Sequence, residues 1–325
     1  MITIREVEPD DPEALALWDE QQQELAERYD APDLELETRF SSLLVSLVGY
    51  SDDEAVATVV LRWSPHHEDG AVEVKRLYVK PDHRGHGHSR ALMGVAESFA
   101  RRAGATRLVL ETGDQQPEAL SLYDSIGYTR IAGYGEWKDD EGTLCYGRTL
   151  PTRLLIVNGT IGAGKTAVAA GVLDALGDRG ARVAFLDADA VCQAAPARES
   201  DPYHQELMFA AMSRLAPLYR QRGYGCVVVA RVVEAPEDRA RWSLAFASEV
   251  GAPEVVVARV TAPLDERRAR IDVREPEGRW RDWAHARTVE LDDVLETQAL
   301  DDVVVENSGR SARDTAEELL AEIGW

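Results

Sequence analysis

Residues 159–166 decide the fold of the second half of the chain, and they read Gly159-Thr160-Ile161-Gly162-Ala163-Gly164-Lys165-Thr166. This stretch fits the pattern GxxxxGK[ST] without a mismatch. An apolar run, RLLIVN, precedes it, and a helical pattern, TAVAAGVLDALGDRG, follows it. Glycines let the backbone N–H groups of such a loop turn inward around phosphate oxygens, and the helix N-terminus adds the positive end of its dipole. The stretch therefore predicts a strand, a phosphate-binding loop and a helix.

The motif also predicts the ligands of this loop, which are ATP and Mg²⁺. We expect Lys165 to reach the β- and γ-phosphates, and the hydroxyl of Thr166 to ligate the metal. Lys165 is the only lysine in residues 151–325. A chain that otherwise uses arginine thus places a compact ammonium where it suits phosphate. The residues expected to bind ATP are Gly159, Gly162, Ala163, Gly164, Lys165 and Thr166.

The remainder of the second half alternates apolar strand-like runs (RVAFLDA, CVVVA, EVVVARV and DVVVEN) with helical patterns. Near-continuous Val/Leu/Ile strands between helices indicate a parallel sheet covered on both faces. Asp187 and Asp189 come at the carboxyl end of the second strand, the ligand-binding edge of such a sheet. They can hold Mg²⁺, orient an acceptor hydroxyl or accept its proton. The alternative is a turn with solvated carboxylates.

In these features residues 152–325 resemble the small P-loop kinases of the shikimate, gluconate and nucleoside-monophosphate kinase type. The resemblance implies that Asp187 contacts metal and acceptor, that Asp189 contacts the acceptor, and that a helical lid supplies arginines to the transferred phosphoryl group. The lid corresponds to DERRARIDVREPEGRW, where Arg270 and Arg274 are the expected catalytic residues. The alternative is an exposed charged helix with i,i+3 and i,i+4 ion pairs.

The third strand, CVVVA, is followed by Arg231 and has no Walker B aspartate. Nucleoside-monophosphate kinases carry an aspartate there, whereas shikimate- and gluconate-type kinases do not depend on one, so the departure favours a small-molecule kinase. Arg231 lies at the same sheet edge, where it either binds an anionic group of the acceptor or is a surface residue. The departure leaves open that this domain only senses or hydrolyses ATP.

A second glycine-containing turn lies in the first half, where residues 79–90 read Val79-Lys80-Pro81-Asp82-His83-Arg84-Gly85-His86-Gly87-His88-Ser89-Arg90. It falls between the strand-like EVKRLYV and the helical ALMGVAESFA. A strand, a glycine turn and a helix N-terminus together favour pyrophosphate binding. Because no GK[ST] follows, this turn is not a second P-loop.

Residues 2–149 resemble the GCN5-related N-acetyltransferase (GNAT) superfamily. Its motif [QR]xxGx[GA] is matched by Arg84 and Gly87, with Ser89 at the last small position, and LVLETGDQQPEALSLYDSIGYTRI resembles the superfamily's later strand-helix-strand. The resemblance implies a mixed sheet with helices, acetyl-CoA as donor and an amine as acceptor. The backbone of Leu77 and Val79 would pair with the pantetheine and the acetyl group. The pyrophosphate would lie against Arg84, Gly85, Gly87, Ser89 and Arg90.

The resemblance also implies an acid and a base. Tyr123 is the expected general acid that reprotonates the departing thiolate, and its alternative is a tyrosine packed under the sheet. Glu73 is the first candidate for the base that deprotonates the amine, acting through water, with Glu111 in reserve. An outward-facing strand carboxylate is the alternative for Glu73.

Length and composition predict an α/β protein of two domains, residues 1–150 and 151–325. Both halves are acidic, and the net charge of −22 argues against nucleic acid and membrane as partners. The charge favours a cationic acceptor, although acidity also serves solubility alone. We expect a cytoplasmic protein, because the N-terminus has no apolar run and the three cysteines have no disulfide or metal spacing. Acceptor specificity is expected in residues 11–40 and 192–225, which carry no readable motif.

The combined prediction is a bifunctional enzyme that acetylates a small amine and phosphorylates a small-molecule hydroxyl, as in natural-product or antibiotic modification. Two alternatives remain: an acetyltransferase with a nucleotide-sensing P-loop domain, and a protein N-acetyltransferase with an ATPase half.

Overall fold

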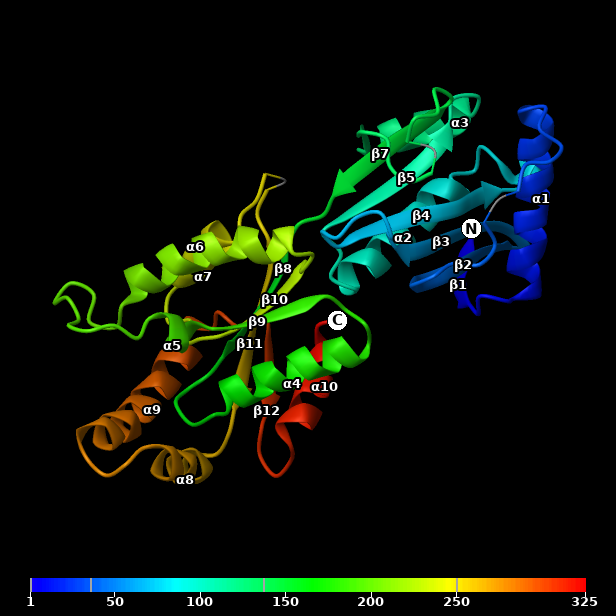
Figure 1. Ribbon diagram of the computed structural model, residues 1–325. Helices are drawn as coiled ribbons and strands as arrows, with labels where there is room; N and C mark the ends of the chain where they lie inside the picture. The colour runs from blue at the N-terminus through cyan, green and yellow to red at the C-terminus, as the bar shows by residue number, and fades with distance from the viewer. Residues whose placement is uncertain (1, 36, 137, 250) are drawn as a thin grey trace. The chain divides into compact units, whose positions relative to one another are not determined.

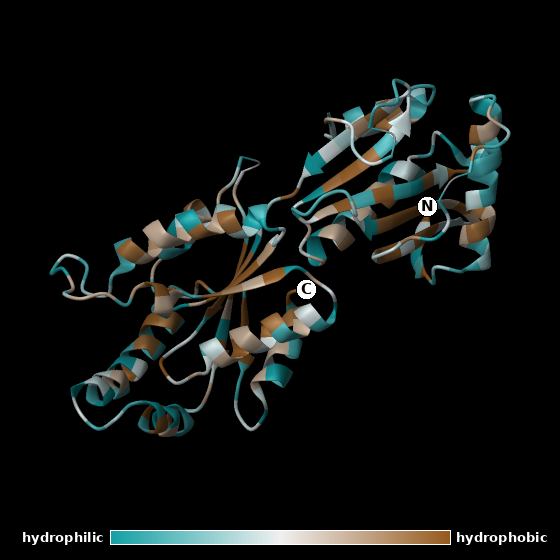
Figure 2. Ribbon diagram, viewed as in Figure 1, coloured by the Kyte–Doolittle hydropathy of each residue, from teal (hydrophilic) through white to brown (hydrophobic). Residues whose placement is uncertain are grey.

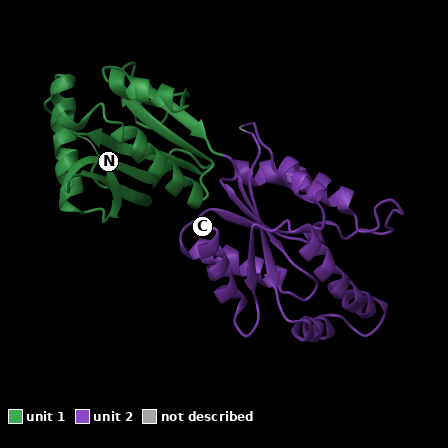
Figure 3. Cartoon of the chain, turned by 180° about the vertical axis from the view of Figure 1, so that it is seen from behind, with its two compact units in different colours: residues 1–150 green, residues 151–325 purple. Residues whose placement is uncertain are grey.

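The computed structural model describes residues 2–35, 37–136, 138–249 and 251–325 of the 325-residue chain. The chain divides into two compact units, residues 1–150 (unit 1) and residues 151–325 (unit 2), as Figure 3 shows. Each hydrophobic core cluster draws its buried residues from one unit only. The two sheets therefore have separate interiors.

Unit 1 contains a seven-stranded sheet in the order β1-β2-β3-β4-β5-β7-β6 (Figure 1). Its strands are β1 (Thr3–Val7), β2 (Leu43–Ser51), β3 (Glu54–Trp63), β4 (Ala71–Val79), β5 (Arg107–Gly113), β6 (Thr129–Arg130) and β7 (Thr143–Thr149). Its helices are α1 (Pro12–Arg28), the short 3₁₀ helix η1 (Pro81–His83), α2 (His88–Arg102) and α3 (Pro117–Ser125). Only β4 and β5 pair in parallel, and the other neighbours are antiparallel. The predicted mixed sheet with helices is confirmed.

The two faces of this sheet are covered by different helices. Helix α1 buries Leu17 and Trp18 against one face, and α2 buries Leu92 and Met93 in the cluster on the other face. Strands β3 and β4 form an antiparallel pair. This arrangement fixes where β4 and β5 meet, which is the part of the sheet that concerns function.

Unit 2 contains a five-stranded parallel sheet in the order β12-β11-β8-β10-β9. Its strands are β8 (Arg153–Asn158), β9 (Val183–Asp187), β10 (Cys226–Ala230), β11 (Glu254–Thr261) and β12 (Val303–Glu306). Its helices are α4 (Lys165–Asp178), α5 (Ala188–Val191), α6 (Gln205–Gln221), α7 (Pro236–Ala245), α8 (Leu264–Arg274), α9 (Arg279–Gln298) and α10 (Ala312–Glu322). The predicted parallel sheet is confirmed.

Helices cover both faces of this sheet, and its strands are apolar along most of their length (Figure 2). Helices α4 and α10 pack on one face, and α6 and α7 pack on the other. The segment 192–225, which carries no readable motif, thus contains helix α6, which buries Met208, Phe209 and Met212.

The register of the sheet brings three strand ends to one edge. Ala230 of β10 lies opposite Val157 of β8 and opposite Asp187 of β9. Gly159 and Arg231, which follow two of these strands, therefore lie at the same edge of the sheet.

Candidate functional sites

The loop of residues 159–166 joins β8 to α4 and has a backbone that requires glycine. Gly162 and Gly164 have φ of 82° and 104°. A Cβ at Gly162 would lie 2.6 Å from the carbonyl oxygen of Arg267, and one at Gly164 would lie 2.3 Å from the side-chain nitrogen of Asn307. Any larger residue would distort the loop or displace α8. The cradle that the motif predicts is therefore present, and it fits a polyphosphate.

Lys165 is the first residue of α4, and its ammonium donates a hydrogen bond to the carbonyl of Thr160 at 3.1 Å. Burial lowers the pKa of Lys165 to about 8, while Asp189 opposes the shift and Arg274 and Arg231 add to it. Positive charges thus converge on the position where phosphate is expected. A bound polyphosphate would offset this repulsion and favour the protonated amine.

The pH dependence of ATP binding follows from this pKa. Phosphate binds the charged ammonium, so affinity is expected to be full below pH 8 and to fall by up to about tenfold per pH unit as Lys165 deprotonates above it. Isothermal titration of the full chain with MgATP from pH 7 to pH 9.5 measures this profile. The Lys165→Ala protein should lack the slope. An affinity for the unaltered protein that stays constant up to pH 9.5 would contradict the assignment.

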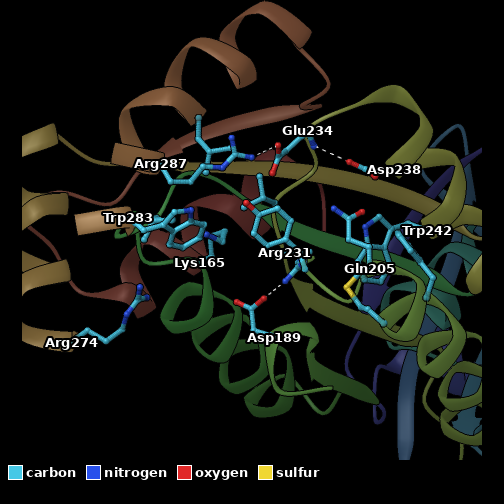
Figure 4. A pocket seen from close by; sticks show the side chains of 16 residues that line it. Lys165, Asp189, Gln205, Arg231, Glu234, Asp238, Trp242, Arg274, Trp283 and Arg287 are labelled. Carbon is cyan, nitrogen blue, oxygen red and sulfur yellow. Dashed lines mark hydrogen bonds and ion pairs between the residues drawn. The ribbon is translucent and has the colours of Figure 1, made fainter. Parts of the chain in front are cut away.

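A cavity of about 210 Å³ opens beside the loop (Figure 4). Its walls bring together four of the predicted residues, Lys165, Asp189, Arg231 and Arg274. Arg231 donates to a carboxylate oxygen of Asp189, so the residue that stands in place of a Walker B aspartate forms an ion pair at the sheet edge. The sequence predicted that these residues share an edge, but not that they pair.

Asp187 lies at the same edge and caps α5. Its Oδ1 accepts the backbone N–H groups of Asp189 at 3.0 Å and Ala190 at 3.3 Å. Oδ2 accepts no hydrogen bond from the described residues. Thr166 is exposed in the first turn of α4, where a metal between it and phosphate oxygens fits. Within the described ranges, no group of three or more His, Cys, Asp or Glu side chains is placed to hold a metal ion.

The lid arginines separate into two roles. Arg274 lines the cavity with a side chain that is 59% exposed. The guanidinium of Arg270 instead donates to the carbonyls of Gly162 and Ala163, both at 3.2 Å, and to that of Asn307 at 2.8 Å. Arg270 thus holds the back of the phosphate loop in this structure, so its predicted contact with a phosphoryl group would need these bonds to break.

Arg267, the first arginine of this helix, belongs to the predicted lid stretch, but the sequence did not reveal its role. It is 5% exposed and donates to Thr160 Oγ1 at 2.7 Å and to both carboxylate oxygens of Asp292. Helices α8 and α9 are thereby joined to the phosphate loop through one guanidinium. In the sequence, only the i,i+4 and i,i+7 spacing of Arg267 from Ile271 and Arg274 indicates that these residues lie on one face of the helix.

The candidate acetyl-donor site of unit 1 begins where β4 and β5 separate. The two strands pair only from Ala71 to Glu73 on β4 and from Arg107 to Val109 on β5. Beyond that point Arg76 has a φ of 53° and the pairing of β4 with β3 shifts register. The result is a parallel pair that splits open towards its carboxyl end, which leaves one edge of Leu77 and Val79 without a strand partner.

The glycine turn lies at the open end of this split. Gly85 and Gly87 have φ of 79° and 80°, and a Cβ at either would meet no atom within 4 Å. The first N–H groups of α2, those of Ser89 and Arg90 among them, have no partner within the helix. The arrangement fits a pyrophosphate.

Arg84 contributes to this turn differently from what was expected. Its N–H donates to the carbonyl of Pro81 at 3.2 Å, so it is engaged within the turn. Its side chain donates to the carbonyl of Val79 and to Glu24. Arg84 thus fastens the turn to β4 and α1 rather than offering its N–H to phosphate.

Tyr123 is buried on α3 between the rings of Tyr128 and Tyr146, whose centroids lie 5.9 and 5.6 Å away. Burial raises the pKa of its hydroxyl above the usual range, and Tyr146 adds to the effect. The phenol therefore stays protonated but is a weaker proton donor than an exposed tyrosine, and its ring lies in the hydrophobic core cluster of unit 1, as the packed alternative has it.

The two candidate bases share one lysine. Lys75 Nζ lies 2.6 Å from Glu111 Oε1 and 3.4 Å from Glu73 Oε1. Glu73 is 1% exposed and accepts a hydrogen bond from Arg62 Nε at 2.6 Å, whereas 17% of the Glu111 side chain is exposed. Glu73 is thus not the outward-facing carboxylate that was weighed as its alternative, and Glu111 is the more accessible of the two.

Tyr134 and His67 complete this cluster, and the sequence reading assigned them no role. The Tyr134 hydroxyl is buried without a hydrogen-bond partner among the described residues. Burial, followed by the charges of Glu73 and Glu111, raises its pKa. The His67 ring packs 4.7 Å from that of Tyr134, and burial lowers the pKa of its imidazole. These side chains come from loops that only the folded chain brings over β4.

Comparison with known protein families finds one match in each half of the chain. Residues 7–128 match the model of the acetyltransferase (GNAT) family, and residues 154–298 match the model of an AAA domain. The chain thus contains a GNAT-family acetyltransferase domain followed by a nucleotide-binding P-loop domain.

Curated relatives are similar over short stretches. N-acetyltransferase family 8 member 2 of Rattus norvegicus is 40% identical over 63 residues, which are 19% of this chain and 28% of that protein. An IAA acetyltransferase of Azospirillum brasilense is 38% identical over 73 residues, which are 22% of this chain and 48% of that protein. The chain thus spans less than half the length of each of these two relatives.

Solved structures of GNAT proteins resemble unit 1 in fold. The PaiA N-acetyltransferase of Thermoplasma acidophilum, in complex with coenzyme A, is 19% identical with a TM-score of 0.34, covering 46% of this chain and 99% of that one. The GNAT domain of S. lividans PAT is 23% identical with a TM-score of 0.37, covering 45% and 89%. None of the described helices is both long and apolar enough to span a membrane.

Proposed function

We propose that this protein transfers two groups: an acetyl group from acetyl-CoA to an amine, and a phosphoryl group from ATP to a hydroxyl, both on small molecules. The observation that carries the proposal is the meeting of Lys165, Asp189, Arg231 and Arg274 in one cavity beside the phosphate loop. A protein that only bound nucleotide would need no cavity for a second molecule next to the γ-phosphate position.

The acetyl half rests on the split between β4 and β5. Acetyl-CoA would supply an activated thioester there, with its pantetheine along Leu77 and Val79. Tyr123, on α3, is the group we assign to reprotonate the thiolate. Glu73 and Glu111 compete for the role of base. Glu111 is the more exposed, and we favour it because Glu73 is already held by Arg62.

The phosphoryl half rests on charge. Lys165 and Arg274 would stabilise negative charge on the transferred group, and Thr166 would hold Mg²⁺. Asp187 has one oxygen engaged in capping α5, and its other oxygen accepts no hydrogen bond within the described part of the chain, so it can accept the proton of an acceptor hydroxyl.

The proposal is tested by incubating amine- and hydroxyl-bearing metabolites and antibiotics with the protein, acetyl-CoA and MgATP, followed by mass spectrometry. Acetylation is expected to add about 42 Da to the acceptor and phosphorylation about 80 Da. General acid catalysis contributes about 10²- to 10⁴-fold to a rate. Tyr123→Phe should therefore slow acetylation about 10²-fold or more and leave phosphorylation unchanged. Acetylation that survives Tyr123→Phe at full rate would withdraw the acid assignment.

A nucleotide-sensing role for unit 2 is the second candidate, and the Arg231–Asp189 ion pair at the Walker B position favours it. It predicts stoichiometric ATP binding, no acceptor-dependent ADP release, and an acetylation rate that changes when ATP binds. Acceptor-dependent ADP release would rule it out.

A further inference from the structure

The cavity beside the phosphate loop has an aromatic wall to which the proposed phosphoryl transfer gives no role. Four of its 16 lining residues are aromatic, whereas aromatic residues make up 7% of the chain. They are Tyr203, Phe209, Trp242 and Trp283. Tyr203 precedes α6, Phe209 lies on α6, Trp242 on α7 and Trp283 on α9. Rings from four separate elements therefore meet around one space.

The wall has a fixed part and an accessible part. Trp242 is fully buried and packs edge-to-face on Phe209, with centroids 4.9 Å apart. Tyr203 and Trp283 are 50% and 38% exposed, and their centroids lie 6.2 Å apart. The first two rings belong to the core of the unit. The other two offer flat apolar surface to a ligand.

The charges of the cavity away from the loop are paired with one another. Arg231 is bonded to Asp189, and Arg287 is bonded to Glu234. Asp238 accepts the backbone N–H groups of Glu234 and Ala235 as the cap of α7. At the phosphate end, Lys165 donates to the carbonyl of Thr160, and Arg274 is paired with Glu275, which does not line the cavity.

The paired charges bear on the kind of acceptor. A cationic acceptor, which the net charge of −22 favours, would find no uncommitted carboxylate among these lining residues. An anionic acceptor would have to break an ion pair to reach a guanidinium. Because removing a partner from a partly buried pair is costly, a neutral acceptor is the better match.

We propose that the acceptor of unit 2 is an uncharged alcohol that carries a flat aromatic group, with its ring against Tyr203 and Trp283. This inference rests on the phosphoryl transfer proposed above. In that reaction the acceptor oxygen bonds to the γ-phosphorus and the bond from that phosphorus to the β–γ bridging oxygen breaks. The electron pair leaves with ADP, and the hydroxyl proton passes to Asp187.

The test measures ADP release by the full chain with MgATP and a panel of alcohols. Tryptophol and 3-phenyl-1,2-propanediol represent the proposed class. Glycerol is neutral without a ring, gluconate is anionic, and glucosamine is cationic. Binding of each compound is measured in parallel by isothermal titration in the presence of a non-hydrolysable ATP analogue.

The aromatic alcohols are expected to give the lowest KM. Trp283→Leu should raise that KM about tenfold, the equivalent of about 1.4 kcal/mol, and change kcat by less than about twofold. The control is Val289→Ala on the same helix. Val289 is 40% exposed and does not line the cavity, so its replacement should leave KM unchanged. Trp280 does not serve as the control, because its ring packs edge-to-face on Trp283 with centroids 5.9 Å apart. Tyr203→Ala, in the loop before α6, is a second variant should Trp283→Leu fail to bind MgATP normally.

The outcomes separate this inference from the function on which it rests. Turnover of glycerol, gluconate or glucosamine in preference to the aromatic alcohols, with KM unmoved by Trp283→Leu, overturns the inference and upholds phosphoryl transfer. Binding of aromatic alcohols that depends on Trp283 without ADP release upholds the binding class and overturns phosphoryl transfer. Absence of any aromatic-alcohol binding at millimolar concentration overturns the inference.

Discussion

Replacing Lys165 with alanine is expected to lower ATP-dependent phosphoryl transfer by a factor of about 100 to 1,000, the effect typical of removing one preorganised charge from a transition state. Lys165 stands at the N-terminus of α4 with its pKa lowered to about 8, and no other lysine occurs in unit 2 to replace it. The measurement is ADP release with the best acceptor, alongside acetyl transfer in the same preparation. Acetyl transfer should not change, because the cores of the two units share no residue.

Lys165→Arg is the informative companion to this variant. It retains the positive charge but replaces a compact ammonium with a longer planar fork. We expect it to restore less than about a tenth of the lost rate. The backbone at Gly162 and Gly164 is packed against Arg267 and Asn307, so the loop has no room to shift for the larger guanidinium. Full activity of Lys165→Ala would remove the basis for assigning phosphoryl transfer to this loop.

The second large effect is on stability. Arg267→Ala is expected to lower the free energy of unfolding of unit 2 by about 1 to 3 kcal/mol, the range for leaving buried polar groups without their partner, because Arg267 is buried whereas 48% of the Asp292 side chain is exposed. The substitution leaves Thr160 and Thr288 without their donor and Asp292 without its cation. Because these bonds join α8 and α9 to the phosphate loop, affinity for MgATP should fall as well.

Urea unfolding of the full chain, followed through the transition that MgATP protects, measures this loss. Arg268→Ala is the matched control, since Arg268 neighbours Arg267 on α8 but is exposed. It should change the free energy of unfolding by less than about 0.5 kcal/mol. A loss below about 1 kcal/mol for Arg267→Ala would show that the network seen around its guanidinium contributes little.

The phosphate loop could be predicted from the sequence because every determinant of its shape is local. Gly162 and Gly164 adopt left-handed backbone angles that favour glycine, and the two positions lie close together in the sequence. The shared edge of Asp189 and Arg231, though not their ion pair, could also be predicted, because parallel strands of matched register end at one edge. That prediction needed only the strand pattern and a general rule of α/β sheets.

The separate roles of Arg267 and Arg270 could not be predicted from the sequence, because the four arginines of α8 differ there only in the direction each faces. Packing against the phosphate loop and α9 decides that direction, and no local pattern encodes it. Tyr134 and His67 illustrate the same limit in unit 1. Each lies in an irregular segment, and their contact depends on how two loops cross the sheet. The sequence did not predict strand β2, because apolar residues lie on both of its faces and no alternation of apolar and polar residues is present.

The split between β4 and β5 has a consequence for solubility. Sheets that end in an open strand edge invite another chain to pair with it, which is a common start of aggregation. Here an open edge lies inside the sheet of unit 1, between two strands that are joined at one end. A bound ligand that hydrogen-bonds along this edge would close the gap much as an added strand does. We therefore expect bound acetyl-CoA to lower the tendency of unit 1 to aggregate through this edge.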